Sequence, residues 1–283
     1  MNRIDFSKCS LSNVLYSGAD EKIGIIFANT NYMLKFAGRG NYGEWFKDVS
    51  EYISAEVFKS VGIEVQETIL GTYNGRNVVA CKDIFNGKKF KPFDELGDSS
   101  IEDKDRYSYS FKEICKLIDK SSKIVEKEKI KANFWKTYII DALLANPDRH
   151  GKNWGFIYQN NKYDICPVFD NGASLFPKIT TDEEYLEILN NEKEINERVY
   201  DRPISLIRND EGIATYFEII SGKKFIDCNK ALIELFPLIN INFIKKIIYS
   251  TDMPDNRKKL ITKIVEQRYE KILKSTYEEL IKK

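Results

Sequence analysis

The first part of the chain alternates between short apolar runs and tight turns, whereas the rest is mainly helical in pattern. Asn and Gly adopt the left-handed backbone that a tight turn needs, so apolar runs on either side of such residues predict β-hairpins. Two hairpins followed by a long helical region predict an α+β fold, with a small sheet before a larger helical part. The paired runs are residues 22–28 with 32–37, around Asn29-Thr30-Asn31, and residues 64–73 with 76–80, around Asn74-Gly75.

A helix is expected between the two hairpins. Over residues 44–61, apolar side chains recur at three- and four-residue spacing on one face, and Gly62 then ends the helix. Residues 85–100 are polar and contain Gly, Pro and Ser, which predicts a connector. The sequence therefore divides into a strand-rich unit, residues 1–84, and a helical unit, residues 85–283.

The helical unit has one predicted interruption. Helices are expected over residues 107–127 and 129–145, and Pro147 ends the second because proline disfavours helix at the residue before it. Two short apolar runs, residues 154–158 and 163–169, then predict a third hairpin. From Thr181 to the end the pattern predicts helices.

Composition excludes several classes of protein. The 283 residues include 44 Lys and Arg against 43 Asp and Glu, so no overall field would recruit nucleic acid. One His excludes metal sites that need several imidazoles. The five cysteines form no CxxC motif, which indicates reduced thiols rather than a disulfide framework. They are Cys9, Cys81, Cys115, Cys166 and Cys228.

The sequence shows no targeting or membrane signal. The first ten residues lack the apolar core of a signal peptide. The most apolar helical stretch, residues 138–145, is short and carries Asp141, whereas a membrane-spanning helix needs roughly 20 apolar residues. We therefore expect a cytoplasmic protein with no membrane partner, and secretion by a signal-free route stays open.

The residues that could take part in catalysis are concentrated in residues 146–174. Asp148 and Asn153 lie five positions apart after a helix, and Asp170 follows the third hairpin. Phosphoryl transfer from ATP needs one carboxylate to accept a hydroxyl proton and further oxygens to hold Mg²⁺. These three side chains would supply those oxygens. Asp, Asn and Gly are also common in loops, so each motif taken alone is more often an ordinary turn than a site.

An earlier strand carries a lysine that fits the same chemistry. Lys35 lies between apolar Leu34 and Phe36, and a kinase needs a strand lysine to reach the phosphates of ATP. An outward lysine on an edge strand is the alternative. Glu51 on the following helix would either pair with Lys35 or be a solvated charge. The turn at residues 17–22 exposes backbone N–H groups that could hold phosphates.

Two of these segments resemble a known family. Residues 17–22 (SGADEK) resemble the SGAQEK-type loop of HipA-like kinases, with Asp20 in place of the usual Gln. Residues 146–153 (NPDRHGKN) and 169–172 (FDNG) resemble the catalytic loop and metal-binding segment of the same family. The resemblance spans about residues 11–175, and it implies a two-lobed protein-kinase-like fold.

The resemblance implies a role for each candidate residue. Asp148 would be the catalytic base, Asn153 and Asp170 the Mg²⁺ ligands, and His150 a brace for the catalytic loop. Ser17 would be a site of autophosphorylation. Residues 79–84 (VACKDI) would form the hinge that reads adenine through backbone groups. The implied nucleotide-binding residues are Ser17, Gly18, Ala19, Lys35, Glu51, Cys81, Lys82 and Asp83.

The resemblance also implies an activity and partners. HipA-like proteins are ATP- and Mg²⁺-dependent Ser/Thr protein kinases. They are often toxins with an antitoxin partner, and in some members the substrate is a translation factor such as a tRNA ligase. Only about ten residues precede the region of resemblance here, which suggests a short or split member and leaves an antitoxin interface open. No direct nucleic-acid contact is expected.

Two other functions stay open at this point. The segment Asn-x-Asp-Arg-His also resembles loops of the phosphatidylinositol 3/4-kinase group, so the same side chains would suit a lipid or small-molecule kinase. A catalytically silent kinase-like binding module is the third hypothesis, although every catalytic residue type is present.

Overall fold

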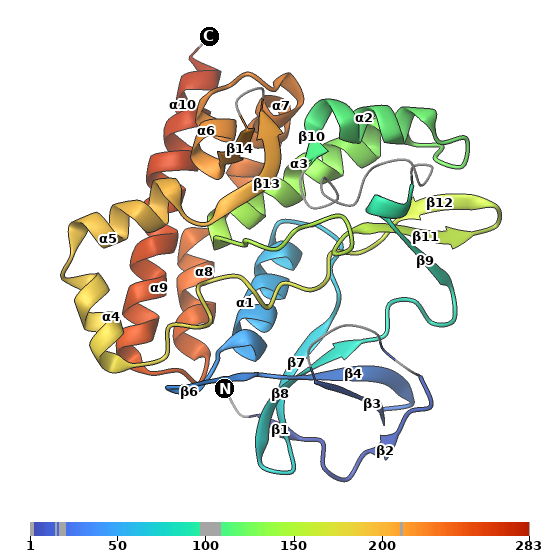
Figure 1. Cartoon of the computed structure of the whole chain (residues 1–283), viewed down its shortest axis with the longest axis vertical. Coiled ribbons are helices and arrows are strands. Elements are labelled where there is room, and N and C mark those ends of the chain that lie inside the picture. Colours follow the sequence, from blue (N-terminus) through green and yellow to red (C-terminus); the bar gives the residue numbers. More distant parts are fainter. Residues whose placement is uncertain (1–2, 15, 17–20, 97–108, 210–211, 283) are drawn as a thin grey trace.

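A six-stranded sheet forms the lower part of the molecule in Figure 1, and helices form the upper part. The computed structural model describes residues 3–14, 16, 21–96, 109–209 and 212–282. The strands lie in the order β1-β7-β8-β4-β3-β2. Their bounds are Ile4–Asp5 (β1), Ser10–Leu11 (β2), Lys22–Phe27 (β3), Thr30–Phe36 (β4), Thr68–Tyr73 (β7) and Arg76–Lys82 (β8).

Both predicted N-terminal hairpins are present. The β7–β8 turn uses Asn74 and Gly75, whose φ angles of 48° and 76° are left-handed. The β3–β4 turn lies one residue earlier than expected. Phe27 pairs with Thr30, and Ala28 and Asn29 take the left-handed conformation, with φ of 48° and 58°. The central strands bury their apolar side chains, so this sheet has its own small core around Phe6, Ile25 and Leu34.

Helix α1, Lys47–Ser60, crosses from the sheet to the helical part. It begins three residues later than the sequence predicted, because Glu44 pairs in the short ribbon of β5 (Arg39–Gly40) and β6 (Gly43–Glu44). Ile53 and Val57 are fully buried in the main core. The helix is in contact with β7 and β8 on one side and with α3 and α8 on the other. It thus joins the two parts of the molecule.

The predicted connector contains a strand. β9, Lys89–Pro92, pairs antiparallel with β11, Gly155–Gln159, which also pairs with β12, Lys162–Ile165. A short 3-10 turn, Phe93–Glu95, follows β9. Backbone pairing with a distant partner outweighs the polar composition of this segment. A side chain at position 155 would lie 2.3 Å from the Lys91 carbonyl oxygen, so glycine is required at this close approach.

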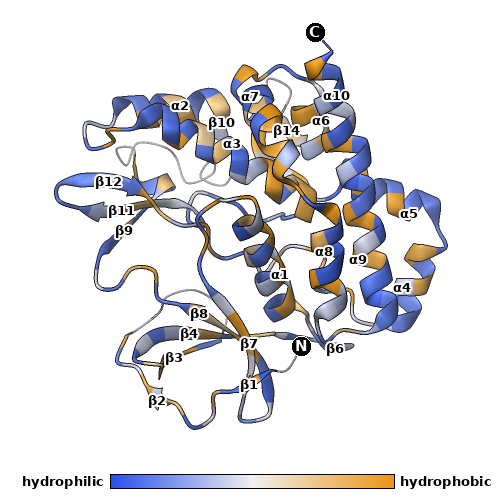
Figure 2. Ribbon diagram, turned by 180° about the vertical axis from the view of Figure 1, so that it is seen from behind, coloured by the Kyte–Doolittle hydropathy of each residue, from blue (hydrophilic) through white to orange (hydrophobic). Residues whose placement is uncertain are grey.

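The helices enclose the main core around α3. Trp135 on this helix is fully buried, and Figure 2 shows hydrophobic residues gathering where the helices of this region meet. The helices are α2 (Phe111–Lys120), α3 (Lys127–Leu144), α4 (Asp182–Leu189), α5 (Glu192–Asn196), α6 (Tyr216–Ser221), α7 (Ile226–Leu235), α8 (Ile241–Ser250), α9 (Asp255–Arg268) and α10 (Ser275–Ile281). Three short helical segments at Glu197–Asp201, Phe236–Leu238 and Tyr269–Lys274 complete this part.

Two expectations for the helical part were wrong. Helix α2 is shorter than residues 107–127, because Ser110 forms a capping box with Glu113 at its start and the chain turns extended at Ser121. The region after Thr181 is also not wholly helical. β13 (Ile204–Asn209) and β14 (Gly212–Thr215) form a hairpin, and β13 pairs in parallel with β10 (Tyr109–Ser110). Within the described part of the chain, no helix is both long and apolar enough to span a bilayer.

Candidate active site

Lys35 connects the sheet to the helical part through two carboxylates. Its Nζ lies 3.1 Å from Glu51 Oε2 on α1 and 2.8 Å from Asp170 Oδ1. The neighbours Leu34 and Phe36 point into the core of the sheet, so alternation along β4 directs Lys35 to the opposite face. The pairing of Lys35 with Glu51, which the sequence left open, is therefore present.

Glu51 is a buried structural carboxylate rather than a solvated charge. Its side chain is 1% exposed. Oε1 accepts hydrogen bonds from Asn171, from the backbone N at 2.8 Å and from Nδ2 at 3.4 Å. Glu51 thus fixes the segment containing Asp170 and Asn171 to α1. Asp170 itself has a left-handed φ of 58°, so this contact helps to hold an otherwise costly backbone conformation.

The electrostatics of this cluster keep Lys35 and Asp170 charged. Burial disfavours the charged form of Lys35, but Glu51 and Asp170 outweigh it and raise the Lys35 pKa well above its ordinary value. Lys35 in turn lowers the pKa of Asp170, against the opposing effect of burial. An ammonium and a carboxylate are therefore both available near neutral pH.

Asp148 and Asn153 lie in one loop directly after α3. The helix ends at a left-handed Ala145, with φ of 53°. Asn153 Nδ2 then donates to the Asp148 carbonyl at 2.8 Å and to its Oδ2 at 3.3 Å. The Asp148 backbone N–H donates to Asn146 Oδ1. The five-residue spacing therefore closes the loop on itself and leaves the Asp148 side chain 51% exposed.

The pKa of Asp148 is raised. Burial is the main cause; His150 opposes it, and Asp170 adds to it. His150 Nε2 lies 3.6 Å from Asp148 Oδ1, and its Nδ1 accepts from the Lys152 backbone N–H at 3.2 Å. His150 thus lies beside Asp148 and within the loop, as a brace would.

Arg149 is the residue that sequence reasoning missed. Its guanidinium makes a bidentate ion pair with Asp141 of α3, at 2.8 and 3.0 Å. Nη1 also donates to the carbonyls of Asn153, at 3.1 Å, and Phe169, at 2.6 Å. Nη2 donates to Asn171 Oδ1. One side chain therefore holds the Asp148 loop and the Asp170 segment together.

A signal for this network was present in the sequence. Asp141 falls on the apolar face of the predicted helix, and a buried carboxylate needs a counter-charge. Asp141 is 1% exposed, and Asn146 Nδ2 also donates to it at 2.8 Å. Arg149 is the nearby cation in the sequence, so the pair could have been predicted.

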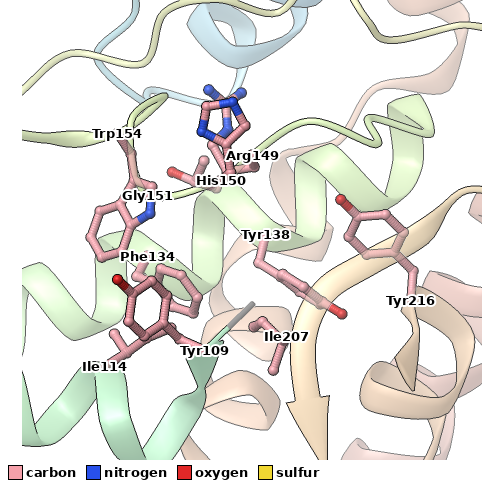
Figure 3. Close-up of a pocket in the computed structure, with 11 residues that line it drawn as sticks. Tyr109, Ile114, Phe134, Tyr138, Arg149, His150, Gly151, Trp154, Ile207 and Tyr216 are labelled. Carbon is pink, nitrogen blue, oxygen red and sulfur yellow. The ribbon is translucent and has the colours of Figure 1, made fainter. Parts of the chain in front are cut away.

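A small aromatic cavity lies behind this loop. It measures about 30 Å³, and Figure 3 shows His150 and Arg149 on one side of it with the rings of Tyr109, Phe134 and Tyr138 on the other. Tyr216 OH donates to the Asn146 carbonyl. The rings therefore pack beneath the Asp148 loop, around a space only about large enough for a water molecule.

The predicted hinge leaves the sheet at the end of β8. Cys81 is fully buried, and burial raises the pKa of its thiol. The Lys82 backbone is paired within the protein: its N–H donates to Glu67 O at 2.9 Å and its carbonyl accepts from Gln66 Nε2 at 2.8 Å. The Asp83 N–H donates to Asn31 O.

The predicted phosphate loop falls partly outside the described residues. This applies to Ser17, Gly18 and Ala19, so their nucleotide-binding roles stay predictions. Glu21, at the end of the loop, makes two 2.7 Å bonds to Arg76 on β8.

Comparisons with known proteins place this site in a family. Residues 14–202 match the family described as HipA-like C-terminal domain. The chain belongs to this HipA-like family. Serine/threonine-protein kinase CtkA of Helicobacter pylori (strain J99) is 32% identical over 285 residues, which cover 96% of this chain and 87% of the relative.

Solved structures confirm the fold of this HipA-like chain. The crystal structure of the H. pylori proinflammatory kinase CtkA matches with a TM-score of 0.91 and 31% identity, covering 99% of this chain and 98% of that one. HipA of Shewanella oneidensis MR-1, solved with HipB and operator DNA, matches with a TM-score of 0.58 and 13% identity, over 96% and 68% of the two chains. The predicted α+β, kinase-like fold is confirmed, and the chain is a HipA-like kinase.

Proposed function

We propose that this kinase transfers the γ-phosphate of ATP, with Mg²⁺, to a serine or threonine hydroxyl of a protein. The observation that carries the proposal is the convergence of Lys35, Glu51 and Asp170 beside Asp148, from four separate segments of the chain. The nearly full-length similarity to a serine/threonine-protein kinase supports the same substrate class over a lipid or small-molecule substrate.

The side-chain oxygens present suit Mg²⁺ bound together with phosphates. Mg²⁺ prefers oxygen ligands and usually takes only one or two from protein carboxylates. Asn153 uses its Nδ2 to bond Asp148, which directs its Oδ1 elsewhere, and Asp170 keeps Oδ2 beyond its bond to Lys35. The described residues contain no group of three or more His, Cys, Asp or Glu that would form an all-protein cage. When bound, the metal would neutralise charge on the phosphates.

Asp148 is assigned the proton-accepting role. Its carboxylate is half exposed, beside Lys35-bound Asp170 yet not tied into the Lys35 cluster. A raised pKa makes a carboxylate a better proton acceptor, provided that it is ionised at the working pH. His150 lies beside Asp148 and lowers its pKa, which would favour the ionised carboxylate. Lys35 would hold the phosphates of ATP.

Adenine would be read beyond Lys82. Because the backbone groups of Lys82 and the N–H of Asp83 are bonded within the protein, the hinge groups proposed for adenine begin at the Asp83 carbonyl. Cys81 would contribute to the adenine pocket through its backbone and not through its buried thiol.

The biological setting is also a proposal. HipA of S. oneidensis was solved with HipB and DNA, but the match covers 68% of that chain, whereas the match to CtkA covers 98%. We therefore favour an effector-type kinase made in the cytoplasm over a toxin held by an antitoxin. A translation factor such as a tRNA ligase remains a candidate substrate, and Ser17 a candidate site of autophosphorylation.

Transfer from radiolabelled ATP to the protein itself and to lysate proteins tests the proposal. We expect Asp148→Asn and Asp170→Asn each to lower the rate at least about 100-fold. Asp164→Asn, which removes an exposed carboxylate on β12, is the matched control and should leave the rate unchanged. Full activity in both site variants would contradict the proposal. Phosphopeptide mapping of the Ser17 peptide tests autophosphorylation in the same samples.

A further inference from the structure

A second pocket opens beside Asp148, which is one of its lining residues. It has a volume of about 460 Å³, within the range of pockets that accept small ligands or single side chains. Its walls are mainly apolar, and the charged groups that line it are Lys47, Asp148 and Lys178. The apolar lining comes from Ala145, Pro147, Ala173, Phe176, Pro177, Ile179 and Pro203.

Two lysines give one rim of this pocket a positive charge. Lys47 Nζ and Lys178 Nζ lie 5.0 and 4.9 Å from the centre of the same Trp45 ring, so both ammonium groups are stabilised by one aromatic side chain. Lys47 is also the first residue of α1, so the positive end of the helix dipole lies at the same rim. Lys47 acts on Asp148 as well, since it lowers the pKa of that carboxyl.

One wall of the pocket is held by a buried arginine. Arg257 on α9 is 1% exposed and donates to the carbonyls of Leu175, Phe176 and Ile179, each at 3.1 Å. Leu175 and Phe176 have left-handed φ angles of 60° and 51°. Such angles cost about 1 kcal/mol or more each for residues with side chains, so the Arg257 bonds fix a conformation the chain would otherwise leave.

A second segment of the pocket lining, next to Pro203, is held in the same way by another arginine of α9. Arg268, at the end of α9, donates to the carbonyls of Arg198 at 2.7 Å, Val199 at 2.9 Å and Arg202 at 3.1 Å. Arg202 directly precedes Pro203, which lines the pocket. A pocket whose walls are fixed before any ligand arrives is typical of a recognition site.

We propose that this pocket binds the substrate protein next to the hydroxyl that is phosphorylated. It takes a large aliphatic side chain, and the Lys47–Lys178 rim takes an acidic residue beside it. This inference rests on the proposed function, because Asp148 at the pocket edge is what places the hydroxyl there. The apolar lining favours an aliphatic side chain, and the two ammonium groups favour a carboxylate over a lysine.

A positional peptide library tests this preference. Each peptide carries one serine, with leucine, alanine, glutamate or lysine placed in turn at the four positions on either side. We expect leucine at one adjacent position, combined with glutamate nearby, to give kcat/KM about tenfold above the lysine counterpart, as two exposed charge contacts allow. Equal rates for the glutamate and lysine peptides would overturn the proposal.

Two variants and one control locate the effect. Lys178→Glu should reverse the preference for glutamate over lysine, and Ile179→Ala should reduce the preference for leucine over alanine. Lys162→Glu makes the same charge change on the exposed strand β12 and should leave both preferences as they are in the native protein. A reversal in Lys162→Glu as large as in Lys178→Glu would show a long-range field rather than this pocket.

A binding assay separates this proposal from the catalytic one. Fluorescence anisotropy with the best peptide, its serine replaced by alanine, measures docking without transfer. Tight binding that Lys178→Glu weakens at least about fivefold supports the pocket even if no transfer occurs. Absence of binding, or binding that Lys178→Glu leaves unchanged, overturns it. Transfer to peptides without any such preference would leave the proposed function intact and reject the pocket.

Discussion

Arg149 and Arg257 are both buried arginines that fix loops by donating to backbone carbonyls, yet their pKa values shift in opposite directions. Arg149 faces Asp141 in a bidentate ion pair, and although burial opposes it, that carboxylate raises the Arg149 pKa. Arg257 bonds carbonyls, and burial lowers its pKa to about 10. Arg268 resembles Arg257, with a pKa also lowered to about 10.

The difference follows the chemistry of each region. Arg149 lies close to Asp148, Asn153 and Asp170. Because Asp141 balances its positive charge, Arg149 can hold these segments without adding an uncompensated charge beside the two proposed catalytic carboxyls. Arg257 and Arg268 hold pocket walls, where the five N–H groups of a guanidinium satisfy several carbonyls at once. The ion pair thus orders the proposed chemistry, and the two arginines bonded to carbonyls order the proposed substrate surface.

The largest effect is expected from breaking the ion pair. Arg149→Met leaves Asp141 buried without its counter-charge, so the free energy of unfolding should fall by about 3–5 kcal/mol. Urea unfolding followed by circular dichroism measures the change. The double variant Arg149→Met/Asp141→Asn should recover part of the loss. An equal loss in the single and double variants would show that the carboxylate is not the cause.

A smaller loss is expected at Arg257. Arg257→Met strands the carbonyls of Leu175, Phe176 and Ile179 but also removes a costly buried charge, so we expect a loss of about 2 kcal/mol. The KM for peptide should rise, whereas the KM for ATP should stay constant, because the pocket wall and not the Lys35 cluster is disturbed. Steady-state kinetics with each substrate varied in turn gives both values. A matching rise in the ATP KM would mean that both regions are held as one unit.

The smallest effect concerns the group shared by both regions. Lys47 lowers the pKa of Asp148, so Lys47→Met should raise that pKa. A base must be deprotonated to act, so the acidic limb of kcat/KM against pH should move to higher pH, by less than about one unit for a solvent-screened pair. Lys162→Met serves as the control. A limb that moves to lower pH would contradict the assignment of Asp148 as the base.

Local spacing made much of the site predictable. The Asp148–Asn153 interval and the lysine between Leu34 and Phe36 are contained within single turns or strands, so their geometry is encoded nearby in the sequence. The same holds for the Asn74-Gly75 turn, which lies at the predicted residues. The role of each side chain in catalysis stays a prediction.

Non-local pairing explains what could not be predicted. β9 exists because its backbone pairs with β11, more than sixty residues later, and β13 pairs with β10 across 98 residues. In residues 85–100 a short alternation of Lys89, Phe90 and Lys91 was the only local sign of a strand, and the polar composition concealed it. The arginines of α9 gave no local sign, because their partners are carbonyls of distant segments.

Gln66 has a mechanical consequence. Its backbone N–H donates to Val168 O, two residues before Asp170, and its side chain donates to Lys82 O, where the chain leaves the sheet; both bonds measure 2.8 Å. Gln66 thus ties the segment before Asp170 to the end of β8, beside the proposed hinge. If the sheet swings, displacement grows with distance from this fulcrum. The proposed hinge beside Lys82 would then move least, and strand β2, at the far edge of the sheet, would move most.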